Sequence, residues 1–190
     1  MRVDFYQLGP NGHDGVIGAL AGKLLADEQR LLLVAEDEAL LARLDRMLWD
    51  EGPASFLPHG LAGGVDDARQ PILLSTTTDA PNRARNILIA DGQWRDAALH
   101  FDRAFYLFDA NTLGGARLAW KLLAGRDEVE RHYWANADGK WVEKGSLALR
   151  HRGSAARGAP TPFPPTHRWS FPWRLPAPFR SSSPTRPAAT

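Results

Sequence analysis

The sequence predicts an α/β fold of the Rossmann-like type, in which helices flank a mostly parallel central sheet. Apolar runs of strand length alternate along the chain with segments whose apolar residues recur at helical spacing. Apolar residues make up 44% of the 190 residues, which is enough for a buried core. Strands that alternate with helices are joined by crossover connections, and these connections favour parallel pairing.

Apolar segments of strand length supply the predicted sheet. The segment 31–36, "LLLVAE", begins with a continuous apolar run and is therefore expected at the centre of the sheet. Near the end of the ordered part, "HYWANADGKWVEK" predicts two short strands around an Ala-Asp-Gly turn. The other predicted strands are 2–8, 71–76, 86–91 and 103–109.

Helical periodicity appears between these strands. Asp37 is a suitable N-cap for the second predicted helix, which continues to about Leu48. In the third predicted helix, Leu118 and Leu122 are an i, i+4 apolar pair. The first and third predicted helices span 14–27 and 112–125.

The composition changes abruptly near residue 145. Residues 1–145 contain 16 Lys and Arg against all 22 Asp and Glu, whereas residues 146–190 contain seven Arg, no acid and nine of the 14 prolines. Proline interrupts the hydrogen bonding of helices and strands. The sequence therefore predicts one folded domain over 1–145 and a disordered Pro/Arg-rich tail over 146–190. This tail is either a basic arm for nucleic acid or an acidic partner, or an extension without function.

Several classes of protein are disfavoured by what the sequence lacks. It has no cysteine, which excludes disulfides and thiolate metal sites and is compatible with a cytoplasmic location. It has no apolar run near the roughly 20 residues that span a bilayer, and we see no signal-peptide pattern. No two of its six histidines form a metal-ligand pair at helical spacing, so no metal is expected.

Two motifs raise enzyme hypotheses. Glycines 9, 12, 15 and 18 recur every third residue, whereas a dinucleotide fingerprint needs two glycines one residue apart. "GALAGKLL" resembles a phosphate loop, but the spacing from Gly18 to Gly22 is one residue too short. Leu24 also stands where such a loop has the hydroxyl residue that holds magnesium. Ser55 and His59 could be nucleophile and base, but no Gly-x-Ser-x-Gly elbow surrounds the serine. A small nucleotide-binding or hydrolytic enzyme therefore remains only an alternative, and no cofactor is expected.

The stretch "AEDEALLARLDRMLWDEGPASFLPHGLAG" combines an acidic strand end, an Arg-Leu-Asp helix, Leu-Trp and Ser-Phe-x-Pro-His. In this order and spacing it resembles the chi subunit of bacterial DNA polymerase III. Further matching segments are "FYQL", "QPILLS", "ILI" and "ARLAWKLL", so the resemblance covers about 1–145.

The resemblance implies a cytoplasmic, non-catalytic adaptor within a DNA-directed DNA polymerase (nucleotidyltransferase) complex. Its implied partners are the psi subunit, which links chi to the clamp loader, and the acidic C-terminal peptide of single-stranded DNA-binding protein (SSB), which ends in Pro-Phe. DNA would be reached only indirectly. The excess of acid over base in 1–145 is consistent with this, because duplex binding needs a concentrated basic surface. Nucleic-acid binding through the tail is the other alternative.

The family's psi-binding surface matches Trp49, Phe56, Pro58 and His59. An exposed Trp and Phe around a rigid Pro would make a preorganised apolar anchor. In the competing interpretation, Trp49 and Phe56 close the core beneath the loop.

The family's peptide site matches Arg117, Trp120, Lys121 and, more weakly, Trp141. Arg117 and Lys121 are i, i+4 and so share a helix face, where two cations could take an acidic peptide and its α-carboxylate. Leu113 replaces a basic residue of some relatives, so weaker binding is expected. The competing interpretation is a solvated basic helix face with Trp120 packed inward.

Overall fold

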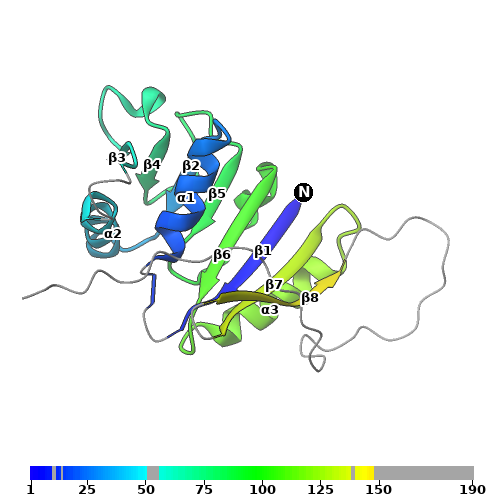
Figure 1. Ribbon diagram of the computed structural model, residues 1–190. Helices are drawn as coiled ribbons and strands as arrows, with labels where there is room; N and C mark the ends of the chain where they lie inside the picture. The colour runs from blue at the N-terminus through cyan, green and yellow to red at the C-terminus, as the bar shows by residue number, and fades with distance from the viewer. Residues whose placement is uncertain (10–11, 14, 51–55, 138–139, 148–190) are drawn as a thin grey trace, which may run out of the picture.

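The computed structural model of the protein contains a single eight-stranded sheet, and it describes residues 1–9, 12–13, 15–50, 56–137 and 140–147 (Figure 1). The strands are β1 (Arg2–Gln7), β2 (Leu31–Val34), β3 (His59–Leu61), β4 (Ile72–Ser75), β5 (Asn86–Ile89), β6 (Arg103–Phe108), β7 (Glu130–Ala137) and β8 (Lys140–Leu147). Their order is β3-β4-β2-β5-β6-β1-β7-β8. Neighbours pair in parallel except for the antiparallel β7–β8 hairpin, so the predicted fold class is confirmed.

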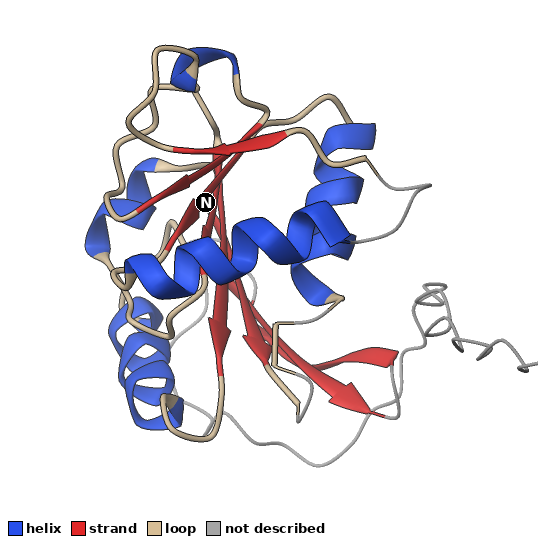
Figure 2. Cartoon of the chain, turned by 90° about the vertical axis from the view of Figure 1, so that its left-hand side faces the viewer, coloured by secondary structure: helices blue, strands red, loops and turns tan. Residues whose placement is uncertain are grey.

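Helices cover both faces of the sheet (Figures 1 and 2). The helices are α1 (Val16–Ala26), α2 (Glu38–Asp50) and α3 (Leu113–Ala124), with two short 3₁₀ turns at Asp67–Arg69 and Asp96–His100. The buried side chains of α1 and α2 pack with one face of the sheet, and those of α3 pack with the other.

The central strand β2 shows why the sheet needs both layers. Leu31 and Leu33 pack with the α1 and α2 side, whereas Leu32 and Val34 pack with the α3 side. All four side chains are fully buried. A parallel strand between two helical layers is apolar on both faces, which is the pattern that the sequence predicted for this segment.

The structure differs from the sequence predictions at both ends of the sheet. The edge strand β3 was not predicted, because three residues are too short to show an alternating pattern, and pairing with β4 creates it. At the other edge, β8 runs to Leu147, which pairs with Arg131, and so continues past the predicted domain end at residue 145. Residues 148–190 lie outside the described residues, and the division into domain and tail stays a prediction.

Within the described residues, no helix has the length and apolar character to cross a membrane.

Candidate functional site

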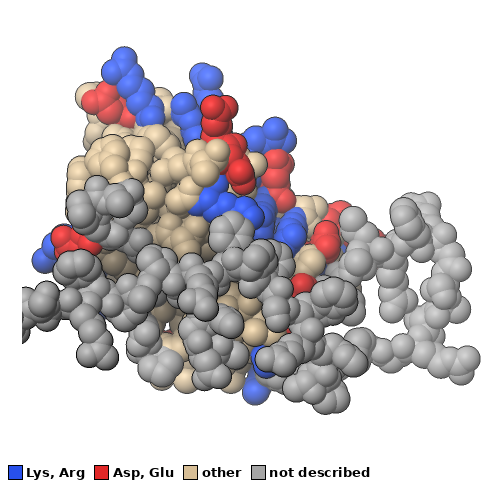
Figure 3. Space-filling model, in the orientation of Figure 1, with Lys and Arg blue, Asp and Glu red and all other residues tan. Residues whose placement is uncertain are grey.

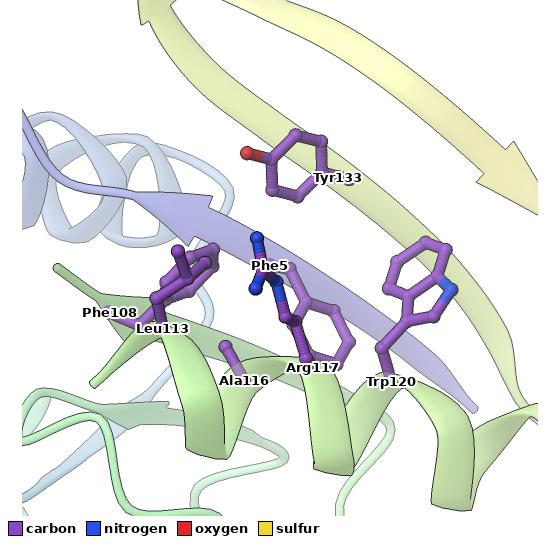
Figure 4. A pocket seen from close by; sticks show the side chains of 7 residues that line it. All are labelled: Phe5, Phe108, Leu113, Ala116, Arg117, Trp120 and Tyr133. Atoms are coloured by element: carbon purple, nitrogen blue, oxygen red, sulfur yellow. The ribbon is translucent and has the colours of Figure 1, made fainter. Parts of the chain in front are cut away.

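An open hollow lies between α3 and the sheet (Figure 4). Side chains from one side of α3 face it, and aromatic residues of β1, β6 and β7 form its floor and far wall. Most of the lining is apolar, and Arg117 supplies the charged group at its edge. The lining residues are Phe5, Phe108, Leu113, Ala116, Arg117, Trp120 and Tyr133.

Trp120 forms one wall of this hollow and is held from two sides. The edge-to-face contact with Phe5 has a centroid distance of 5.0 Å and an interplanar angle of 72°. The guanidinium carbon of Arg131 lies 4.6 Å from the centre of the indole ring. Trp120 is half-buried, so it is neither a fully exposed side chain nor one packed wholly into the core. The ring is a fixed wall available to a ligand.

Arg131, on β7, is a residue that the sequence reasoning missed. It is 3% exposed and donates a hydrogen bond to the backbone carbonyl of Trp120. Burial lowers the pKa of Arg131. In the described part of the chain no carboxylate forms an ion pair with it, although buried charges are normally paired. The signal available in the sequence was a basic residue immediately before the predicted strand segment that contains the aromatic pair Tyr133 and Trp134.

The two predicted cations of α3 are both exposed, and they differ in position relative to the hollow. Arg117 borders the hollow, whereas Lys121 lies one turn further along the helix and is not part of the lining. Leu113 contributes apolar surface to the hollow, at the position where the family resemblance implies a basic side chain in some relatives. The site is therefore apolar in its interior and cationic along one edge. An acidic peptide with an aromatic terminus has matching chemistry.

Tyr133 closes the hollow opposite α3. Its hydroxyl donates a hydrogen bond to the side-chain oxygen of Gln7. Burial raises the pKa of Tyr133, and the positive charge of Arg117 only partly offsets that effect. The phenol is thus neutral at physiological pH and offers the hollow an apolar ring.

Trp141 is not brought to the hollow. It stands edge-on to Tyr6 at a centroid distance of 5.0 Å and packs against the core on the α1 and α2 side of the sheet. In the β7–β8 hairpin Trp141 pairs with Asn136, and directly paired residues point to the same face. The hairpin register therefore places Trp141 on the face opposite Trp120. Nothing in this arrangement supports a direct role for Trp141 in the hollow.

A second candidate surface lies where α2 ends. The side chains of Trp49 and Phe56 are 59% and 73% exposed, with their ring centroids 6.2 Å apart. Leu48, beside Trp49 in sequence, is buried in the core. The two aromatic rings therefore do not close the core, and they form an exposed apolar pair. Pro58 is half-buried close by in the chain.

His59 contacts the Trp49 ring of this aromatic pair. Its ring is 4.9 Å from that of Trp49, and its side chain is fully buried. Its Nδ1 lies 2.6 Å from the carbonyl oxygen of Leu57, and its Nε2 lies 3.2 Å from that of Asp45. Each ring nitrogen thus faces a backbone carbonyl, and Nε2 also lies 3.4 Å from a carboxylate oxygen of Asp45. This leaves His59 poorly placed as a general base or as a direct contact for a partner, and Ser55 lies outside the described residues.

Charged groups on the described surface are mixed in sign. Figure 3 shows basic and acidic side chains interspersed along the upper margin of the visible face. Surface ion pairs join Arg69 to Asp66 and Arg85 to Asp102, at 3.2 and 2.6 Å. Among the described residues no group of three or more His, Asp or Glu is placed to hold a metal ion.

Comparison with known proteins points to one family. Residues 1–129 match the family model described as "DNA polymerase III chi subunit, HolC". Two relatives, both named DNA polymerase III subunit chi, come from Pseudomonas aeruginosa PAO1 and Escherichia coli K12. The first is 34% identical over 91 residues, which cover 46% of this chain and 62% of the relative. The second is 36% identical over 62 residues, which cover 33% of this chain and 42% of the relative.

A third relative of the same name, from Haemophilus influenzae Rd, is 30% identical over 70 residues, or 37% of this chain and 49% of the relative. The aligned segments thus span about half the length of these curated relatives.

Proposed function

Because the chain belongs to the family of DNA polymerase III chi subunits, we propose that it is a non-catalytic adaptor of the replicase. In this proposal, the hollow beside α3 binds the acidic C-terminal peptide of SSB. The exposed pair Trp49 and Phe56 binds a psi subunit or another component of the clamp loader. The protein would then couple the polymerase assembly to coated single strands during DNA replication.

The hollow carries this proposal. Its interior is lined by aromatic and aliphatic side chains, with Arg117 at its edge. An aromatic side chain at a peptide terminus would find apolar contacts against Phe5 and Trp120, and the terminal carboxylate would reach the guanidinium. Since Trp120 is already held between Phe5 and Arg131, little side-chain entropy is lost on binding.

The second surface supports a second partner. Trp49 and Phe56 are large, adjacent and exposed, which is unusual for side chains without a partner. When exposed aromatic residues of this kind become buried against a partner, they supply most of the binding energy in many interfaces. The two surfaces lie on opposite layers of the sheet, since α2 and α3 pack on different faces. One molecule could therefore hold both partners at once.

A fluorescence titration with a labelled acidic peptide ending in Pro-Phe tests the peptide site. Arg117→Glu should reduce the affinity at least tenfold, because reversing a charge in a partly desolvated site replaces attraction with repulsion. Arg43→Glu is the matched control, since Arg43 is exposed on α2 and the charge change is identical. A peptide without its final Phe should bind poorly to the unaltered protein even at low salt. The proposed peptide site is refuted if both Arg117→Glu and the Phe-less peptide leave the affinity unchanged.

A further inference from the structure

The outward face of α3 carries an apolar row that the fold does not need. Leu118 and Leu122 are 69% and 53% exposed, although large aliphatic side chains on a helix normally face the core. The buried residues of α3 that pack on the sheet are Ala116, Ala119 and Leu123, and the half-buried Leu113 and Trp120 lie on the same side. The two leucines point away from these and lie one turn apart.

This apolar row runs beside the cations of the same helix. Arg117 directly precedes Leu118, and Lys121 directly precedes Leu122, so each leucine is about 100° around the helix from a cation. The helix surface thus has a cationic row next to the hollow and an apolar row outside it. Each row is about 6 Å long, the rise of four residues.

We propose that Leu118 and Leu122 bind an aliphatic side chain of the same acidic peptide, upstream of its terminal aromatic residue. This inference rests on the proposed function of the hollow. A helix with its side chains is about 10–12 Å wide, and an extended peptide advances about 3.3 Å per residue. A peptide that leaves the hollow and crosses α3 therefore reaches the apolar row about three to five residues before its end.

Charge complementarity favours this occupant over a second copy of the chain. A partner that covers both rows must present acidic groups to Arg117 and Lys121 and an apolar group to the leucines. A two-fold contact between identical α3 helices would instead bring like charges together. Two leucines also supply little of the roughly 800 Å² per partner that a stable interface buries.

A double-mutant cycle tests the inference on the full-length chain. The test peptides are acidic, end in Pro-Phe and carry a single leucine at the third, fourth or fifth position from the end. Each has a matched control peptide with serine in place of the leucine. The unaltered protein should bind the best leucine peptide about tenfold more tightly, the order expected for partial burial of aliphatic groups. Leu118→Ser/Leu122→Ser should abolish this preference while still binding the serine peptide. Val65→Ser is the control, because Val65 is fully exposed outside α3.

The outcomes separate the inference from the function on which it rests. If the serine peptide binds but no leucine position improves the affinity, the apolar row has no role and only this inference fails. It also fails if the preference survives in the double variant. If neither peptide binds, the proposed function itself fails. Sedimentation velocity adds a last check. A dimer formed by the unaltered protein but not by the double variant would assign the row to a second copy and overturn the proposal.

Discussion

Asp4, on β1, is fully buried, and its carboxylate accepts hydrogen bonds from four nitrogen atoms of three residues. Arg2 donates to both carboxylate oxygens at 2.7–3.0 Å, Arg103 donates at 2.7 Å and the indole of Trp134 donates at 2.8 Å. Burial alone would raise the pKa of Asp4, but the hydrogen bond from Arg2 and the charges of Arg103 and Arg2 outweigh it, so the pKa is lowered. This carboxylate ties β1 to β6 and β7.

Asp4→Asn should lower the free energy of unfolding by about 3 kcal/mol or more, because it leaves two guanidinium groups without their buried partner. Urea unfolding at pH 7 measures the change. Asp102→Asn is the control, since Asp102 pairs with Arg85 at an exposed site and should cost below about 1 kcal/mol. Equal costs for the two variants would contradict a special role for the buried carboxylate.

The same residue predicts a pH dependence. A carboxyl group whose pKa is lower in the folded than in the unfolded chain stabilises the fold above its unfolded pKa, and this contribution is lost as the pH falls through the folded pKa. The free energy of unfolding should therefore decrease as the pH drops below about 4. Asp4→Asn should lack this part of the acid sensitivity, which urea titrations from pH 7 to 3 would reveal.

Arg131→Met should weaken peptide binding several-fold without destabilising the fold. Replacing a buried charge that lacks a carboxylate with an apolar side chain is often neutral or stabilising, whereas Trp120 would lose the cation that holds its ring. Parallel peptide titrations and urea unfolding measure the two effects. Arg131→Lys, which keeps the charge, should retain more affinity. An unchanged affinity for Arg131→Met would remove Arg131 from the site.

At the scale of elements, each candidate surface belongs to one helix and what lies beside it. The last turn of α2 carries Trp49, which forms the exposed pair with Phe56, and the helix is anchored through buried residues such as Leu44. α3 borders the hollow and packs on the opposite face of the sheet. Substitutions on one surface should therefore leave the other surface intact, because contacts that are distant and share no partners act independently.

Trp49→Ala and Phe56→Ala should each weaken binding of a clamp-loader component by about 2 kcal/mol, the usual effect of truncating an aromatic hot spot. Peptide binding should not change. Pull-down with the psi subunit, where the organism has one, and peptide titration measure the two contacts. Leu44→Ala is the contrasting variant, because its buried side chain should cost about 2–5 kcal/mol of folding stability. Global unfolding by either aromatic substitution would show that the pair stabilises the domain instead.

At the scale of the whole molecule, the change in composition along the chain predicts how the last 43 residues, 148–190, contribute to stability. Deleting them should leave the melting temperature nearly unchanged, because their sequence has many prolines and no apolar period. Deletion after Gly145 should cost more, since it also removes Leu147 from its pairing with Arg131 in the sheet. Calorimetry of the full chain and the two deletions would check this. A loss of several degrees on removing 148–190 alone would show that this segment packs on the domain.

The sequence by itself determined the layered fold, because apolar periodicity reports which residues must leave water. The segments that became β2, β5 and β6 were recognisable from their apolar runs, and α1, α2 and α3 from their helical spacing. Arg117, Trp120 and Lys121 could be placed on one helix by the same spacing. The family resemblance was also carried by local segments, which the match over residues 1–129 confirms.

Only the tertiary structure decided which of these side chains meet. Trp141 was grouped with Trp120, but the register of the β7–β8 hairpin turns it to the other face. His59 was grouped with the exposed aromatic pair, but its side chain is buried and its ring nitrogens contact Leu57 and Asp45. Arg131 reaches Trp120 only because β7 packs under α3. Such contacts depend on strand register and helix placement, which are set by long-range packing and leave no periodic trace in a single sequence.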